Sequence, residues 1–355
     1  MGRWRRWEIA WLIESLGLLG ATLGVLWGTP PGDGPFIALA APTSVALGVR
    51  PEADAASPEE GPPMLAVAQT ERGQVFWWTH PRVRYVLEFL RPVGVALDGA
   101  GRLWVGDDAL NAVFSVSARG RQLDFRCWQD AGLLDRPVDF AFGEEAVLIL
   151  DNGKGHVLRM DMDGRREVLI GGLIFPTALQ LVQEPMGLEY RLLVTDMGLP
   201  SYFQKNQPVV RVYQTDLRWA QALGTYGQGL LEYPVALVVQ DDTLDVLDGH
   251  LSQRLQFDLA TGGLLGRTGE YGTGPGQWRN PSDMAKAAAC RVVADTGNDR
   301  LVIEAERVPV ETCRWASGPP LVEWHARLNR CEPVGSVIAD SARARVERVA
   351  GEVRP

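Results

Sequence analysis

The stretch GEYGTGPGQWRNPSDMA, residues 269–285, combines closely spaced glycines with one tryptophan and two prolines. The glycines suggest at first a loop that cradles a phosphate. Such a loop must follow a strand and open a helix, so that the helix N-terminus meets the phosphate. Here the glycines lead into Trp278 and Pro281, and then into another predicted strand. A weaker copy at residues 224–229 precedes Pro234, and a loop that recurs at the same place is architectural.

Short apolar runs that open with a proline recur along the chain, at Pro42, Pro92, Pro137, Pro176, Pro234 and Pro281. Their spacings are 50, 45, 39, 58 and 47 residues, and a repeat of roughly 40–50 residues is typical of a propeller or solenoid. Each copy continues with a turn, a second apolar run, a polar turn and an alternating run, which is the pattern of β-strands. Six units of four strands predict an all-β, six-bladed β-propeller, because a lone four-stranded sheet cannot bury both its faces.

The run ADTGNDRLVIE, residues 294–304, preceded by GTGPGQWRNPSDMA, resembles the NHL repeat. The resemblance is specific at 269–304, moderate at 92–117, 137–161 and 224–258, and degraded at 42–79 and 176–213. It implies a six-bladed propeller, which agrees with the six prolines. We place the propeller at residues 42–340 and a C-terminal tail at 341–355. The run EPVGSVIAD, residues 332–340, imitates an opening strand, so it either adds a strand beside the first blade or begins a seventh; we expect six blades.

Before the propeller lies an apolar run of 19 residues, Ile9–Trp27, which would span about 28 Å as a helix at ~1.5 Å per residue. Arginines precede it, which places the N-terminus in the cytoplasm and the remainder outside. We therefore predict a signal-anchor or transmembrane helix at residues 1–28, a linker at 29–41, and a propeller that faces the periplasm or the cell exterior. The alternative is a cleaved signal peptide and a secreted protein, because Ala38–Ala40 resembles a cleavage site.

The net charge and the cysteine spacing argue against two classes of function, nucleic-acid binding and a cysteine zinc site. A net charge of −9 gives no basic footprint for nucleic acid. Four cysteines occur, at positions 127, 290, 313 and 331, without zinc-site spacing. In an exported domain Cys313 and Cys331 could pair, which would stabilise a C-terminal loop by about 3 kcal/mol. The alternative is four unpaired, small apolar side chains.

Candidate binding residues occupy the third position of each opening motif, where the strands enter the axis of a propeller. Only two of these six positions are charged, Asp139 in the third unit and Asp283 in the sixth. They would lie on opposite sides of the ring, where two carboxylates could hold a cation or share a proton. The interpretation that we favour is structural, because aspartate at such a position often accepts backbone hydrogen bonds.

Other polar residues are less suited to chemistry. The second apolar run ends in aspartate in five units, at 107, 151, 196, 248 and 295, and a residue that recurs in every blade is expected to hold a turn. His156 and His250 share a face but come from non-adjacent units. NHL-like amidating lyases place zinc-binding histidines just after the opening proline, and none lies within three residues there. Gluconolactonase-type propellers hold a metal with Glu, Asn and Asp, and only Asp139 and Asp283 could contribute here.

Two functions follow from these patterns. The first is a membrane-tethered, extracytoplasmic NHL-type propeller that acts as a binding scaffold for a protein, peptide or glycan, with no catalytic residues and no nucleic-acid partner. The second is a metal-dependent hydrolase or lyase, lactonase-like, with Asp139 and Asp283 at the propeller axis. We expect no cofactor, apart from the divalent cation that this second function would require.

Overall fold

The computed structural model describes residues 36–48, 63–81, 83–161, 163–184, 189–198, 208–306, 322–331 and 334–338, and positions 308, 313 and 315. The chain divides into two compact units, residues 1–34 and 35–355. The predicted anchor, Ile9–Trp27, belongs to the first unit and lies outside the described residues. Within the described part of the chain, no helix has the length and apolarity to cross a membrane.

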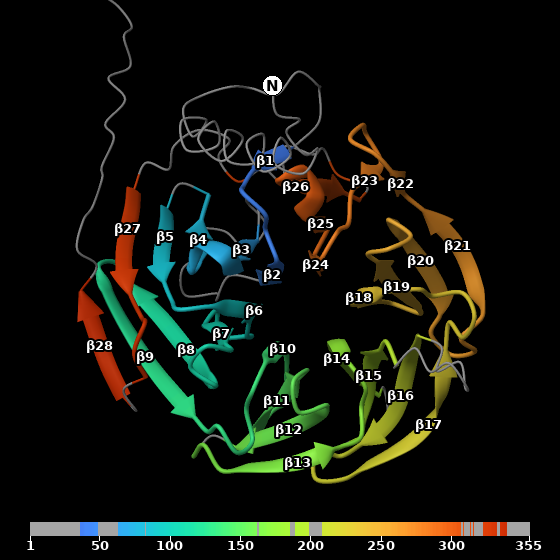
Figure 1. Cartoon of the computed structure of the whole chain (residues 1–355), viewed down its shortest axis with the longest axis horizontal. Coiled ribbons are helices and arrows are strands. Elements are labelled where there is room, and N and C mark those ends of the chain that lie inside the picture. Colours follow the sequence, from blue (N-terminus) through green and yellow to red (C-terminus); the bar gives the residue numbers. More distant parts are fainter. Residues whose placement is uncertain are drawn as a thin grey trace, which may run out of the picture. The chain divides into compact units, whose positions relative to one another are not determined.

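The second unit is a ring of six twisted antiparallel sheets around a central axis (Figure 1). Each blade runs outward from its innermost strand, which confirms the predicted all-β, six-bladed propeller. The strands of blades one to three are β2 (Ser44–Gly48), β3 (Met64–Gln69), β4 (Gln74–His80) and β5 (Val83–Glu88); β6 (Pro92–Leu97), β7 (Leu103–Asp107), β8 (Ala112–Arg119) and β9 (Gln122–Gln129); β10 (Pro137–Phe142), β11 (Ala146–Asp151), β12 (His156–Asp161) and β13 (Arg166–Ile170).

Blades four and five are built in the same way, and blade six takes its outermost strand from the other end of the propeller. Their strands are β14 (Pro176–Gln183), β15 (Tyr190–Asp196), β16 (Val209–Thr215) and β17 (Ala220–Tyr226); β18 (Pro234–Gln240), β19 (Thr243–Asp248), β20 (Gln253–Asp258) and β21 (Leu264–Thr268); β24 (Asp283–Ala287), β25 (Cys290–Asp295), β26 (Arg300–Ala305) and β1 (Phe36–Ala38). Two short strands, β22 (Glu270–Tyr271) and β23 (Gln277–Trp278), pair within the glycine-rich stretch.

The ring closes where its first strand completes its last blade. β1 pairs antiparallel with β26, with Phe36 opposite Val302 and Ala38 opposite Arg300. The chain then enters β2, the innermost strand of blade one (Figure 1). Because one short segment belongs to blade six and the next to blade one, the two ends of the repeat array are joined by backbone hydrogen bonds.

Two further strands extend the outer edges of blades one and two. β27 (Val322–Arg327) lies parallel to β5, and β28 (Val334–Ile338) lies antiparallel to β9. Both alternatives predicted for residues 332–340 were therefore wrong, since the described part of this segment, residues 334–338, lies on blade two and does not begin a seventh blade. The physical reason is at β9, whose eight residues pair with β8 in unbroken register and so offer a regular edge to a fifth strand. The outer strands of blades three, four and five carry β-bulges instead, which discourage such pairing.

The cysteine pairing also differs from the prediction. Cys313 and Cys331 do not pair with each other; Cys127 pairs with Cys331 and Cys290 with Cys313. Both pairs have Cα atoms 5.4 Å apart, within the range that a disulfide needs. Cys127 belongs to β9, so its bond secures the segment that leads into β28. Cys290 belongs to β25, so its bond ties the chain after β26 back to blade six.

Apolar side chains fill the spaces between neighbouring blades. Trp278 is buried between Val235 of blade five and Val293 of blade six. Trp77 and Trp78 of β4 are both buried, so neither is an exposed anchor for a partner. Tyr233, which also follows a glycine-containing stretch, is instead 48% exposed.

Candidate axial ligand site

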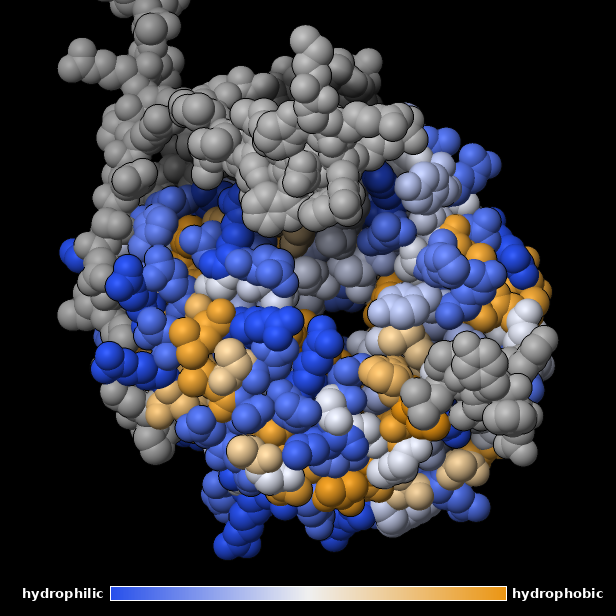
Figure 2. Space-filling view, in the orientation of Figure 1, coloured by the Kyte–Doolittle hydropathy of each residue, from blue (hydrophilic) through white to orange (hydrophobic). Residues whose placement is uncertain are grey.

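A cavity of about 640 Å³ opens at the axis of the propeller, visible as a hollow in Figure 2. Its volume is that of a small-molecule pocket. All six blades contribute to its wall, because the same positions of each repeat face it. They are the residue before the opening proline (Arg91, Arg136, Phe175, Tyr233, Asn280), the residue after it (Thr43, Val93, Val138, Thr177, Val235, Ser282), the third position (Ser44, Asp139, Asp283) and the polar turn (Thr70, Glu71, Asn152, Met197, Gly249, His250), together with Pro281 itself.

The recurring aspartates hold this wall in place. Asp107 is fully buried, and its carboxylate accepts the backbone N–H of Arg91 at 2.9 Å and that of Leu110, in the following turn, at 3.1 Å. One side chain thus joins the segment before the proline to the second turn of the blade. The same pattern recurs for Asp151 with Arg136 and Lys154, and for Asp248 with Tyr233 and Leu251. The structural role predicted for these aspartates is confirmed.

Asp139 projects into the cavity from β10, the inner strand of blade three. Its Oδ1 accepts the backbone N–H of Phe140 at 2.8 Å, and its Oδ2 accepts that of Leu179 at 2.8 Å. Leu179 belongs to β14, the inner strand of the next blade. The carboxylate therefore joins two neighbouring inner strands, while part of the side chain stays open to the cavity.

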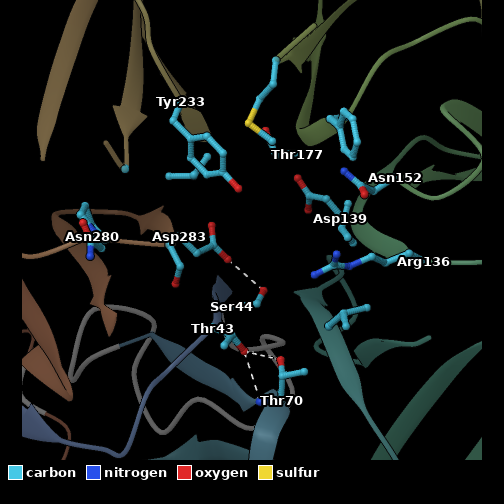
Figure 3. Close-up of a pocket in the computed structure, with 18 of the residues that line it drawn as sticks. Thr43, Ser44, Thr70, Arg136, Asp139, Asn152, Thr177, Tyr233, Asn280 and Asp283 are labelled. Carbon is cyan, nitrogen blue, oxygen red and sulfur yellow. Dashed lines mark hydrogen bonds between the residues drawn. The ribbon is translucent and has the colours of Figure 1, made fainter. Parts of the chain in front are cut away.

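Asp283 plays the equivalent part in blade six. Its Oδ1 accepts the N–H of Met284 at 2.7 Å, and its Oδ2 accepts both the hydroxyl of Ser44 at 2.9 Å and the N–H of Val45 at 2.8 Å. Ser44 and Val45 belong to β2, so this carboxylate joins the last blade to the first. Asp139 and Asp283 point into the same space from opposite sides (Figure 3). The predicted placement across the ring is therefore correct.

The structure also raises the pKa of both carboxyl groups. Burial is the main cause, and the neighbouring charge of Asp283 adds to it at Asp139, whereas the backbone donors oppose it. The pKa of Asp139 rises to about 8 and that of Asp283 to about 6. At neutral pH the pair therefore keeps about one proton between its two carboxyl groups.

Two aromatic side chains line the cavity from adjacent blades. Phe175 precedes Pro176 and is 50% exposed; Tyr233 precedes Pro234 and directs its hydroxyl into the cavity (Figure 3). Phe175 has a φ of 52°, a left-handed conformation that is unusual for a bulky residue and indicates local strain. The site thus has two features: carboxyl groups on facing inner strands, and exposed aromatic side chains at the entrances of two other inner strands.

The two histidines of this face do not meet. His156 is buried, and its Nε2 lies 2.9 Å from the carbonyl oxygen of Leu133. His250 lines the cavity, and its Nδ1 lies 2.9 Å from Glu232 Oε2. Their separate partners agree with their origin in non-adjacent units.

A resident divalent metal fits the wall poorly. Among the residues that the structure describes, no three His, Cys, Asp or Glu side chains are grouped so that they could hold an ion. Asp139 and Asp283 are two oxygen donors whose carboxylates already accept backbone hydrogen bonds. Calcium usually takes six to eight oxygen ligands, so these two carboxylates fall short of a complete coordination sphere.

Sequence reasoning identified two residues of this wall and missed most others. Tyr233, Phe175, Arg91 and Arg136 stand immediately before an opening proline. That position was a usable signal, since a residue which comes just before an inner strand must lie at the strand entrance. The prediction that the third position faces the axis therefore misses these residues.

Comparison with known proteins supports the fold. No family model and no curated protein matches the chain. Among solved structures, a proposed gluconolactonase superposes with a TM-score of 0.55 at 15% identity, covering 78% of this chain and 93% of its own. A gluconolactonase from Xanthomonas campestris gives 0.52 at 16%, covering 77% and 88%. A virginiamycin B lyase from Staphylococcus aureus gives 0.49 at 10%, covering 70% and 78%. At these identities the first two matches show a shared six-bladed propeller architecture.

Proposed function

We propose that this chain is an extracytoplasmic binding propeller of the NHL type, tethered to a membrane by residues 1–28, which takes a ligand into its axial cavity. The observation that carries the proposal is the pair Asp139 and Asp283, which face one cavity of about 640 Å³ from opposite inner strands. Two groups that can each donate or accept a hydrogen bond, placed in a partly apolar pocket, are typical of a binding site.

The disulfides support the proposed location. All four cysteines are paired, in Cys127–Cys331 and Cys290–Cys313. Disulfides form and persist in the periplasm or outside the cell and are rare in the cytosol. A propeller held at the outer side of a membrane would meet those conditions.

The binding proposal is tested on full-length protein purified from its own membranes. Native mass spectrometry should show an added mass on the wild type that is lost from Asp139→Asn and from Asp283→Asn. Asp163→Asn, a change at an exposed turn, should keep the added mass. An added mass that survives in both cavity variants would place the ligand elsewhere and refute the axial site.

A second candidate is the metal-dependent hydrolase or lyase, lactonase-like, at the same axis. It is favoured by the shared architecture with two gluconolactonase structures, and the incomplete set of metal donors weighs against it. Metal analysis with assays of lactone hydrolysis separates the two candidates. Stoichiometric metal and turnover, both lost in Asp139→Ala and Asp283→Ala, would favour the hydrolase; metal-free protein without turnover would favour binding.

A further inference from the structure

We propose that the axial cavity selects a small organic cation, an ammonium or guanidinium compound that donates N–H hydrogen bonds to Asp139 and Asp283. The inference rests on the proposed axial binding site and names the chemical class of its ligand. Three observations carry it: the charge at the facing carboxyl groups, their unused acceptor capacity, and the aromatic surface beside them.

The first observation is a lack of compensating charge. Burial, backbone N–H groups and, for Asp283, the hydroxyl of Ser44 act on the two carboxyl groups, and the charge of Asp283 acts on Asp139. No Arg, Lys or His among the described residues contributes. A desolvated carboxylate without a cationic partner is unfavourable. A bound cation would supply the missing charge and allow both groups to ionise.

The second observation is the number of free acceptor positions. An ionised carboxylate has roughly four lone-pair positions. Asp139 accepts hydrogen bonds from Phe140 and Leu179, which leaves about two positions. Asp283 accepts three, which leaves about one. An ammonium group has three N–H donors, which matches in number the open acceptor positions of the two carboxylates.

The third observation separates an organic cation from a metal ion. Phe175 and Tyr233 expose about half of their surface, 50% and 48%, and line the same cavity from neighbouring blades. Aromatic faces attract organic cations and pack against their alkyl groups. A metal ion would gain little from these rings and would lack a third carboxylate or imidazole ligand among the described residues.

The remaining basic groups of the wall each have a carboxylate neighbour. The guanidinium groups of Arg91 and Arg136 lie 3.5 and 3.9 Å from the same oxygen of Asp108, and His250 pairs with Glu232. Glu71 adds one more negative charge. The positive charge near the cavity is therefore partly neutralised by carboxylates, which leaves the facing pair available to a cation.

The test compares amines with alcohols of the same shape. Full-length protein is titrated by calorimetry with butylamine and 1-butanol, with 1,4-diaminobutane and 1,4-butanediol, and with phenethylamine and 2-phenylethanol. At least one amine should bind ten times or more tightly than its alcohol, because a charge-assisted hydrogen bond is worth about twice a neutral one. Asp139→Asn and Asp283→Asn should each weaken that amine about tenfold or more, while Asp163→Asn should leave its affinity unchanged.

A second measurement uses the wild type alone, so a variant that misfolds does not decide the outcome. Binding of a cation should release protons from the carboxyl pair, and affinity for the amine should rise between pH 7.5 and 9. In this range an ordinary histidine has already lost its proton, and ordinary arginine and glutamate side chains do not change charge. Proton release is read from the binding heats in buffers of different ionisation enthalpy.

The outcomes separate this inference from the axial site itself. If alcohols bind as tightly as their amines, and Asp139→Asn and Asp283→Asn lose that binding, the preference for a cation is refuted but the axial site is supported. If calcium saturates the cavity and prevents the amines from binding, the ligand is a metal ion and the proposal of an organic cation is refuted. If no amine binds at 10 mM, on the order of a weak fragment affinity, the inference is overturned, whereas an Asp-dependent native ligand mass would still support the site.

Discussion

Asp283 in the last blade accepts a 2.9 Å hydrogen bond from the hydroxyl of Ser44 in the first blade. The oxygen of Ser44 in turn accepts the backbone N–H of Val95, in blade two, at 3.1 Å. These bonds connect the inner strands of blades six, one and two across the point where the ring closes. The same side chains line the axial cavity, so closure of the ring and the shape of the site depend on the same contacts.

Ser44→Ala should destabilise the propeller by about 1–3 kcal/mol, because the change leaves the buried N–H of Val95 without its acceptor. The free energy of unfolding from a urea titration measures this effect. Ser117→Ala is the matched control, since the Ser117 hydroxyl makes only a long, exposed bond of 3.4 Å, and it should change stability by less than about 0.5 kcal/mol. Equal effects of the two changes would contradict the role of Ser44 at the closure.

Stability should fall as pH rises from 5 to 9. The pKa of Asp139 is raised to about 8 and that of Asp283 to about 6, above the values near 4 of an unfolded chain. The folded state therefore holds more protons than the unfolded state, and it loses this advantage as pH rises through 6 and then 8. Unfolding free energies at several pH values test the sign.

Asp139→Asn removes the carboxyl group with the higher pKa. The free energy of unfolding of this variant should therefore change less between pH 7 and 9 than that of the wild type. The carboxyl groups with lowered pKa, such as Glu306 and Glu323, are ionised throughout this range and do not contribute to the slope. A wild-type stability that increases between pH 5 and 9 would show that the two carboxyl groups are not held in the environment described.

Gly94→Ala should destabilise the protein by more than about 3 kcal/mol, above the usual 1–3 kcal/mol of an overpacked site, or prevent folding. A Cβ at position 94 would lie 2.1 Å from the backbone oxygen of Val138, on the inner strand of the next blade. Gly99→Ala is the control, because a Cβ there meets nothing within 4 Å. Thermal unfolding of both variants decides whether blades two and three approach each other so closely.

Cys127→Ser together with Cys331→Ser should lower stability more than Cys290→Ser together with Cys313→Ser. The first bond spans 204 residues and the second 23, and the loop-entropy model gives up to about 5 and about 3 kcal/mol. Hydrogen exchange should increase along β9 only in the first variant, because β28 would lose its covalent tether. Peptide mapping without reduction tests the pairing itself, and a Cys313–Cys331 peptide would contradict it.

The residues before and within each opening motif show which features of the fold and the site the sequence pattern predicts. The spacing of the prolines and the alternation of the strands predicted the six blades, since these periodicities reflect local backbone geometry. The position of Asp139 and Asp283 across the ring followed from counting blades. The exposure of Tyr233 did not follow, because an aromatic residue next to a glycine-rich loop suits either a sheet interface or a cavity wall.

The sequence by itself determined the blade number, the order of strands within a blade and the buried aspartates that hold each strand entrance, because all of these arise from contacts within one repeat. Only the tertiary structure decided the cysteine partners, the place of β28 on blade two, and the bond from Asp139 to Leu179, which lies 40 residues further along the chain. These contacts join one blade to the next or join a blade to the chain that follows the last repeat. No periodicity within a repeat encodes such partners.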